Sequence, residues 1–400
     1  MDSWCGLIAK VLVDRGYKVF ILTPGAPEHG FVHSQDETSD SKIEYLKWKF
    51  SIAERLRLTV ISVLSRLPMI LDFLIKARQR RRGGRLGQVQ SRSSSGDVHP
   101  KSFEYHVNWA MRQRKVSPDL ILNLYLDVYR SDKPSWSAIK IDGNTPFAGL
   151  RFVGDGEGED GVCTANGFRG IALFEEGMYR KYNSRYKNLR VIQLPDITNT
   201  EFDSVNKYEM KQVQELAKNR TVVFLGGSIG GNKNIGKFVE VISMMDSDHW
   251  FFLVIGKVDK TTFTESDLVE YDKIESGVFK NVLLIDQYIE SESIFNGYIY
   301  ASDIVYAVYR NFEFSSNMLM KASSFNKPIV VSDRYEMGRR VNSARIGCTV
   351  NEDDASSIAY GLKQALEKPI KAEQFIAYNK SNSIDEFGNL LQDFVEDCHV

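Results

Sequence analysis

The chain has 400 residues, a length that suggests two domains with ample hydrophobic core. It is 43% hydrophobic and 26% charged, with a net charge of −1, which is ordinary for a soluble protein and excludes a polycation that binds nucleic acid through its overall charge. Its four cysteines show no CxxC or metal-type spacing and no signal peptide is evident, so we expect a cytoplasmic protein without structural disulfides.

The first half alternates helical and extended patterns. Apolar residues spaced three and four apart predict a helix at 3–17, and the apolar run that follows predicts a buried strand at 18–22. Beyond residue 100 the same patterns predict helices at 102–113 and 176–185, and strands at 119–126, 146–153, 170–175 and 189–196.

The segment 41–92 is strongly basic, with thirteen Lys or Arg against three Asp or Glu. Its apolar run, 58–75, contains Arg66, Pro68 and Asp72 and is at the short limit for a membrane span. We therefore expect two amphipathic helices, the second starting at Pro68. Two interpretations stay open: a helix hairpin packed on a core with a solvated basic end, or contact with an anionic membrane surface or anionic acceptor. The Gly- and Ser-rich stretch 83–100 predicts a loop.

The second half is more regular and follows a polar stretch, 197–206. Apolar strands are predicted at 221–226, 250–256, 281–286, 303–309 and 328–332, with helices from about 233 and at 264–276, 290–301, 315–325, 334–345 and 354–367. This alternation predicts an α/β fold of two doubly wound Rossmann-like domains, in which parallel sheets are covered on both faces and ligands bind outside the carboxyl ends of the strands. The predicted domains are 1–196 and 197–380, followed by a C-terminal helix in 381–400 that can pack back on the first domain.

Three of these strands are followed by candidate ligand groups. After 221–226, small residues let backbone amides approach an anion and a lysine can neutralise a phosphate, although a plain tight turn explains this stretch equally well; the residues are Gly230, Gly231, Asn232 and Lys233. Gln287 and Tyr288 follow the strand 281–286 and can present backbone groups to a flat ring. Ser315, Ser316 and Asn317 can cap the next helix and leave amides free for a second anion.

Residues 221–367 resemble the donor-binding domain of GT-B glycosyltransferases of family 4, which are retaining enzymes that use nucleotide-sugars. The resemblance runs through "VVFLGGSIGGNKN", "NVLLIDQY" and "YRNFEFSSNMLMKASSFNKPIVVSD". It implies that Glu313 is the first acid of the Glu-x7-Glu motif, which engages the sugar, and that Lys233 contacts the donor diphosphate. Lys321 stands where the family's second acid holds the ribose, so the resemblance implies a donor contact by a group that cannot accept a hydrogen bond. The arginine that precedes the lysine in the family is absent here.

The first half matches the family's acceptor domain more thinly, through 4–25 and 117–127. The family's opening strand has no counterpart, so we expect either a chain that starts late or a sheet that is built differently. The acidic loop 154–161 lacks the twelfth-position acid of a calcium loop, where Asn166 stands, but Asp155 follows a strand and is a candidate for acceptor contact. The six histidines lack zinc-type spacing, so no protein-bound metal is predicted.

Together these features predict a metal-independent retaining glycosyltransferase of the hexosyltransferase type, with no cofactor apart from its nucleotide-sugar substrate. The expected acceptor is a glycan, a lipid-linked or a small molecule, as in polysaccharide biosynthesis. The expected location is cytoplasmic, with peripheral membrane contact through 41–92 and no nucleic-acid partner. A nucleotide-sugar epimerase on the same fold and a non-catalytic binding or scaffold subunit remain alternatives.

Overall fold

A computed structural model of the chain describes residues 2–23, 43–47, 98–129, 131–153, 159–202 and 207–399. They belong to two compact units: a first unit of Met1–Leu194 with Gly388–Val400, and a second unit of Pro195–Phe387. Asp155, the predicted helix pair in 58–75 and almost all of the basic segment lie outside the described residues.

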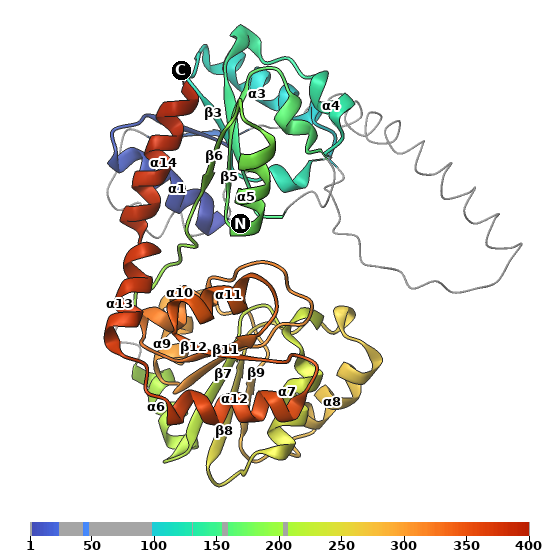
Figure 1. Ribbon diagram of the computed structural model, residues 1–400, viewed down its shortest axis with the longest axis vertical. Helices are drawn as coiled ribbons and strands as arrows, with labels where there is room; N and C mark the ends of the chain where they lie inside the picture. Colours follow the sequence, from blue (N-terminus) through green and yellow to red (C-terminus); the bar gives the residue numbers. More distant parts are fainter. Residues whose placement is uncertain are drawn as a thin grey trace, which may run out of the picture. The chain divides into compact units, whose positions relative to one another are not determined.

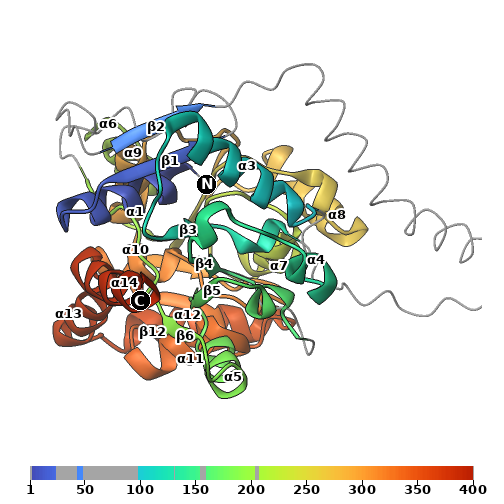
Figure 2. The same ribbon diagram turned by 90° about the horizontal axis from the view of Figure 1, so that it is seen from above.

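The first unit contains two parallel sheets (Figure 1). One has the strand order β3-β4-β5-β6, and β1 and β2 form a separate pair, seen side by side in Figure 2. The predicted helices at 3–17, 102–113 and 176–185 are confirmed. The elements are α1 (Asp2–Asp14), β1 (Val19–Thr23), β2 (Ile43–Lys47), α3 (Lys101–Arg114), β3 (Ile121–Asn123), α4 (Lys133–Ser137), β4 (Phe147–Arg151), β5 (Phe168–Leu173), α5 (Glu176–Arg185), β6 (Arg190–Gln193) and α14 (Ile384–His399).

The predicted strand 119–126 is wrong in its second half. The Oδ1 atom of Asn123 accepts a hydrogen bond from the backbone N–H of Tyr125 at 2.9 Å. This local turn ends β3 after three residues, and a 3₁₀ helix, Leu126–Val128, follows it. A side chain that bonds to nearby backbone thus overrides the β-rich composition of the stretch.

The main sheet of the first unit is covered on both faces. On one face, Ile171 and Leu173 of β5 pack in a core with Phe103 and Trp136. On the other face, a Cβ placed on Gly170 would lie 2.5 Å from the Sγ atom of Cys398, which shows how closely α14 packs on β5. The end of the chain therefore supplies one of the layers of the first unit (Figure 1).

The second unit has a six-stranded parallel sheet with the order β12-β11-β10-β7-β8-β9 (Figure 1). Each strand and helix predicted from 221 to 367 is present, although the helix predicted at 315–325 is shorter, and β12, α6 and α13 were not predicted. The elements are α6 (Lys207–Ala217), β7 (Thr221–Gly226), α7 (Ile235–Met244), β8 (Trp250–Ile255), α8 (Glu265–Glu275), β9 (Val282–Ile285), α9 (Glu292–Tyr300), β10 (Ile304–Ala307), α10 (Met318–Ser324), β11 (Ile329–Ser332), α11 (Tyr335–Ala344), β12 (Gly347–Val350), α12 (Ala355–Glu367) and α13 (Ala372–Ser381).

Alternate residues of the strands supply two separate cores. Val223 and Leu225 of β7 point to the face covered by α7, α8 and α12, whereas Val222 and Phe224 point to the face covered by α6, α9, α10, α11 and α13. Because both faces are buried, the strands are apolar throughout, as predicted. The fold class, α/β with doubly wound parallel sheets, is confirmed.

The strand order places the ligand crevice within this sheet. From β7 the chain proceeds outward to β8 and β9, and from β10 it proceeds outward in the opposite direction to β11 and β12. The direction of winding reverses between β7 and β10, and ligands of doubly wound sheets bind outside the carboxyl ends of the strands at that switch point. The loops that follow β7 and β10 are therefore the functional candidates.

Candidate functional site

The loop after β7 is a preformed turn that presents unbonded amides. The N–H of Gly231 donates to the Oγ1 atom of Thr262 at 2.9 Å, and a Cβ on Gly231 would lie 2.2 Å from the Thr262 carbonyl oxygen, so only glycine fits. The amides of Gly230 and Asn232 have no partner among the described residues. This arrangement agrees with the prediction of a loop that can receive an anion, although the amide of Gly231 is already used.

Lys233 ends the 3₁₀ turn Gly231–Lys233 and is half-buried. Its Nζ atom lies 3.7 Å from the centroid of the Tyr309 ring, a cation–π contact with the residue that follows β10 by two positions. The lysine is thereby held at the switch point, between the two candidate loops.

The loop after β10 contains Glu313, which is exposed. The predicted helix start at 315 is wrong by three residues, because α10 starts at Met318 and has only seven residues. Within the part of the chain that the structure describes, the amides of residues 315–317 have no hydrogen-bond partner, and the Oγ atom of Ser315 is buried without one. Ser316 instead uses its hydroxyl to accept from the N–H of Met318 at 3.3 Å. The loop thus offers several unbonded donors, and the binding of an anion there stays a prediction.

Gln287 and Tyr288 follow β9, the edge strand of the sheet, which β8 separates from β7. Both are exposed, Tyr288 to 76%, and no hydrogen bond, ion pair or ring contact between described residues joins them to the loops after β7 and β10. The structure therefore does not bring them into the candidate site.

The prediction that Lys321 contacts a donor is corrected by the structure. The Lys321 side chain is 2% exposed. Its Nζ atom donates to the carbonyl oxygen of Asn199 at 3.0 Å, to Glu292 at 2.6 Å and to Oδ1 of Asn296 at 2.7 Å. An ammonium group has three hydrogens, and all three are used. Lys321 is therefore a structural residue that ties α10 to α9 and to the segment following β6.

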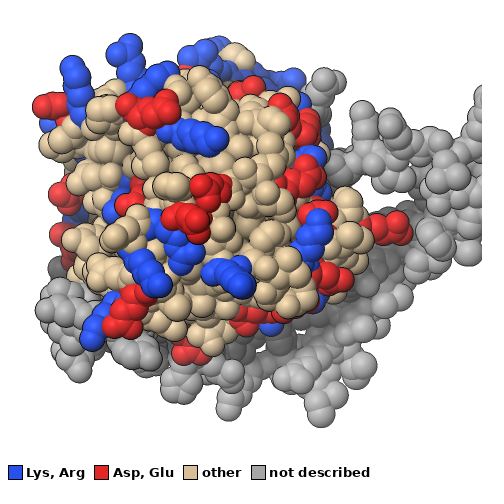
Figure 3. Space-filling model, turned by 90° about the horizontal axis from the view of Figure 1, so that it is seen from below, with Lys and Arg blue, Asp and Glu red and all other residues tan. Residues whose placement is uncertain are grey.

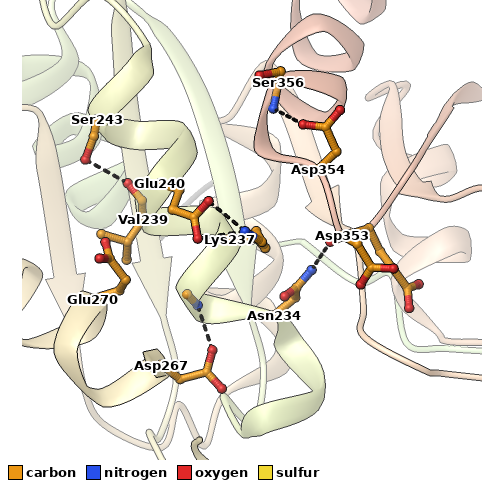
Figure 4. A network of polar contacts seen from close by, with 12 residues as sticks. Asn234, Lys237, Val239, Glu240, Ser243, Asp267, Glu270, Asp353, Asp354 and Ser356 are labelled. Atoms are coloured by element: carbon orange, nitrogen blue, oxygen red, sulfur yellow. Dashed lines mark hydrogen bonds and ion pairs between the residues drawn. The ribbon is translucent and has the colours of Figure 1, made fainter. Parts of the chain in front are cut away.

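Four residues at the switch point were missed by the sequence reasoning: Asn234, Asp267, Arg310 and Glu352. Figure 4 shows Asn234 and Asp267. The N–H of Gly236 donates to Asp267 at 3.2 Å. The Arg310 guanidinium donates to both Asp267 oxygens at 2.8 Å and to Oδ1 of Asn234 at 3.2 and 3.0 Å. Arg310 follows a predicted strand, and this position was the one available signal. Asp267 and Glu352 carry no local signature of a role at the switch point.

Electrostatics keeps Asp267 ionised. Burial by itself would raise the pKa of Asp267, but the hydrogen bonds from Arg310 and Thr264 outweigh it, and its pKa lies well below the usual range. The side chain is fully buried, so the pair with Arg310 compensates a charge that would otherwise be costly.

In the first unit, Asp127 lies at the end of β4, the strand that precedes Asp155 in the sequence. Its carboxylate accepts hydrogen bonds from the N–H groups of Phe152 and Val153, at 2.9 and 2.8 Å, where β4 ends. Burial is the main cause of the raised pKa of Asp127, and these hydrogen bonds oppose the shift. Asp155 itself lies outside the described residues, so its predicted role stays a prediction.

No family model matches the chain, and no curated protein matches it. None of the described helices has the length and apolar character required to cross a membrane. Similar solved structures extend over nearly the whole chain. Sucrose-phosphate synthase from Thermosynechococcus elongatus is 12% identical with a TM-score of 0.61, and the match covers 97% of this chain and 91% of that one.

Two further structures agree. The trehalose-6-phosphate synthase OtsA is 10% identical, with a TM-score of 0.64 and coverage of 98% of this chain and 93% of that one. WaaG, a glycosyltransferase involved in lipopolysaccharide biosynthesis, is 11% identical, with a TM-score of 0.57 and coverage of 98% and 94%. At this level of identity the likeness concerns the fold. The chain therefore has the two-domain α/β fold of the GT-B glycosyltransferases.

Proposed function

We propose that this chain is a glycosyltransferase that moves a sugar from a nucleotide-sugar donor to an acceptor hydroxyl. The observation that carries the proposal is the convergence of a held cation, Lys233, and two loops with unbonded amides at the switch point of the second unit. A nucleoside diphosphate has the charge and the acceptor oxygens that such a site would bind.

In the proposed reaction, Lys233 and the amides of the two loops stabilise the diphosphate as it leaves. Glu313 engages the transferred sugar and stabilises positive charge at its anomeric carbon, while an acceptor hydroxyl attacks. Catalysis then consists of positioning and electrostatic stabilisation. Since lysine and amides can offset the leaving charge, we propose a metal-independent reaction, and the resemblance of the Glu313 motif supports retention of configuration.

The names of similar structures support the proposed substrates. One is described as trehalose-6-phosphate from E. coli bound with UDP-2-fluoro glucose, at a TM-score of 0.62. Another is a UDP-forming trehalose-phosphate synthase in complex with glucose-6-phosphate, at a TM-score of 0.53. We therefore propose a nucleotide-sugar donor, keep glycans and lipid-linked molecules as acceptors, and propose small sugar phosphates as the class of the expected small-molecule acceptor.

The first test is a thermal-shift screen of the full chain with UDP, GDP and ADP. A ligand at 100 times its dissociation constant stabilises the folded state by about 2.7 kcal/mol, which is readily seen as a raised Tm. We expect one nucleotide to raise the Tm and the matching nucleotide-sugars to be hydrolysed slowly without acceptor. If none of the three nucleotides shifts the Tm, the proposed function is wrong.

A non-catalytic binding subunit is the second candidate, and the buried Lys321 favours it. The position that carries the ribose-binding acid in the resembling family is occupied here by a residue whose hydrogens are all used internally. Donor hydrolysis separates the two, because a binding subunit would bind nucleotide but release no sugar. An epimerase would instead release free nucleotide and an isomerised sugar in the absence of any acceptor.

The distribution of charge on the surface bears on the proposed partners. On the face of the molecule seen in Figure 3, Lys and Arg side chains are interspersed with Asp and Glu, so this face offers no continuous basic surface for nucleic acid. Attachment to the inner face of an anionic membrane is proposed only for the basic segment 41–92, on the basis of its sequence.

A further inference from the structure

The loops after β7 and β10 are joined by a closed ring of hydrogen bonds. The N–H of Arg310 donates to the carbonyl oxygen of Asn232 at 2.8 Å, and its guanidinium donates to the Asn234 side chain. The Nδ2 atom of Asn234 donates to the carbonyl oxygen of Glu352 at 2.7 Å. The Glu352 carboxylate closes the ring by accepting from the N–H of Asn311 at 2.9 Å.

Two members of the ring are buried, and two of its residues have unusual backbone conformations. Asn234 is 1% exposed and Glu352 is fully buried. Asn234 and Asn311 both have left-handed backbone, with φ of 56° and 49°, a conformation that asparagine tolerates better than most residues. Residues in sparsely populated conformations persist where the surroundings determine them, and here the ring supplies that constraint.

Two residues that are close in sequence to members of this ring carry the proposed chemistry. Lys233 lies between Asn232 and Asn234, and Glu313 follows Asn311 by two positions. The ring therefore links the segment that carries the cation proposed for the diphosphate to the segment that carries the carboxylate proposed for the sugar. Two of its three side chains, Asn234 and Glu352, are buried, and that of Arg310 is 26% exposed.

We propose that Glu352 is a positioning residue, which locks the Glu313 loop to the Lys233 loop so that the sugar and the diphosphate are held in one geometry. This inference rests on the proposed function and adds to it a residue from the loop that follows β12, a third loop beside the two candidate loops. Displacement of a reacting group by about 1 Å can cost roughly a hundredfold in rate, so a rigid link of this kind has a kinetic role.

The hydrogen bonds that the Glu352 carboxylate accepts decide which substitutions test its positioning role. Its second carboxylate oxygen accepts from the Ser332 hydroxyl, and Arg334 approaches the first at 3.4 Å. Glu352→Met keeps the approximate size but removes both acceptors. Glu352→Gln can still accept from the Asn311 N–H, because the Ser332 hydroxyl can rotate to accept from the new amide. Asp353→Met is the matched control, since this neighbouring carboxylate is exposed and pairs with Arg334.

The experiment compares nucleotide affinity, donor hydrolysis and amide hydrogen exchange of the full-length variants. For Glu352→Met we expect turnover to fall at least tenfold. The Kd of the nucleotide found in the UDP, GDP and ADP screen should change less than threefold. Amide hydrogen exchange should accelerate in peptides covering 228–234 and 308–317. Glu352→Gln and Asp353→Met should stay close to wild type in all three. If Glu352→Met does not fold, Asn234→Gly breaks the same ring while keeping the left-handed backbone, and the same pattern is expected.

Two results would overturn the inference. One is wild-type turnover in Glu352→Met despite faster exchange in the two loops. The other is acceleration spread evenly over the second unit, which would indicate general destabilisation. A wild-type chain that binds none of the three nucleotides refutes the proposed function instead, so the two failures are distinguishable.

Discussion

Arg310 and Asp267 form a bidentate ion pair in the second unit, with the two terminal guanidinium nitrogens each 2.8 Å from a carboxylate oxygen. Asp267 is fully buried, whereas the Arg310 side chain is 26% exposed. The acid also accepts hydrogen bonds from the N–H groups of Gly236 and Thr264, so α7, α8 and the loop after β10 meet at one carboxylate.

Because of this ion pair, the stability of the fold at low pH tests whether Asp267 is ionised in the folded protein. The pKa of Asp267 is lowered in the folded state, so its contribution to stability is complete above its unfolded pKa of about 3.9 and is lost as the pH falls through that value toward the folded pKa. Asp267→Asn should lower the free energy of unfolding at pH 7 by about 3 kcal/mol and flatten its dependence on pH below about 4, as measured by urea denaturation. The exposed Asp272→Asn on the same helix is the control. If the free energy of unfolding of Asp267→Asn falls with decreasing pH as steeply as that of wild type, this assignment is refuted.

Glu313 is expected to act on the sugar rather than on the nucleotide. Glu313→Gln should lower turnover by roughly a hundredfold or more, the usual effect of losing one preorganised electrostatic group, with nucleotide affinity nearly unchanged. Steady-state kinetics and calorimetry measure the two quantities, with Glu373→Gln at an exposed position as the control. Wild-type turnover in Glu313→Gln would remove the residue from the mechanism.

Lys233 is expected to recognise the diphosphate. Lys233→Met should weaken binding of a nucleoside diphosphate by roughly tenfold to a hundredfold, because a charge-assisted hydrogen bond contributes about 1.5–3 kcal/mol, but should change nucleoside binding little. Lys237→Met, one turn along at a lysine that pairs with Glu240, should affect neither ligand. Calorimetric losses of equal size for diphosphate and nucleoside would place Lys233 outside the phosphate site.

The buried contacts of Lys321 predict that an acid at this position destabilises the fold, although the family resemblance places an acid there. Restoring the acid of the family motif by Lys321→Glu would place a carboxylate against Asn199, Glu292 and Asn296, whose contacting atoms are all hydrogen-bond acceptors. We expect Lys321→Glu to lower the Tm more than Lys321→Met, because it adds repulsion and an unpaired buried charge to the lost hydrogen bonds. A Lys321→Glu chain as stable as wild type and with raised turnover would contradict the structural role.

The basic segment predicts binding to anionic lipid. Each basic residue near an anionic bilayer contributes about 1 kcal/mol, and the effect decays within a Debye length. The chain should therefore sediment with anionic but not neutral vesicles, and salt should release it. Replacing five arginines with glutamine should abolish sedimentation and leave donor hydrolysis unchanged; they are Arg78, Arg80, Arg81, Arg82 and Arg85. Equal binding to anionic and neutral vesicles would favour the alternative, a helix hairpin packed on a core with a solvated basic end.

Much of the second unit could be predicted from local patterns. Strands such as 221–226 and 250–255 are continuous apolar runs because both faces of the sheet are buried, and periodicity within a few residues reveals them. The loops that contain Lys233 and Glu313 could be predicted for the same reason, because they directly follow such strands. By contrast, β12 is a four-residue strand that begins with Gly347, so it has no strong local pattern.

The sequence by itself determined the succession of strands and helices and the positions of the two candidate loops, since these depend on neighbours along the chain. Only the tertiary structure decided which polar residues belong to those loops. Lys321 was assigned to a ligand by its place in a motif, but folding brings it against Asn199, 122 positions away. Glu352 had no local signal, because a buried carboxylate is stable only beside donors such as the N–H of Asn311, and sheet topology alone brings these together.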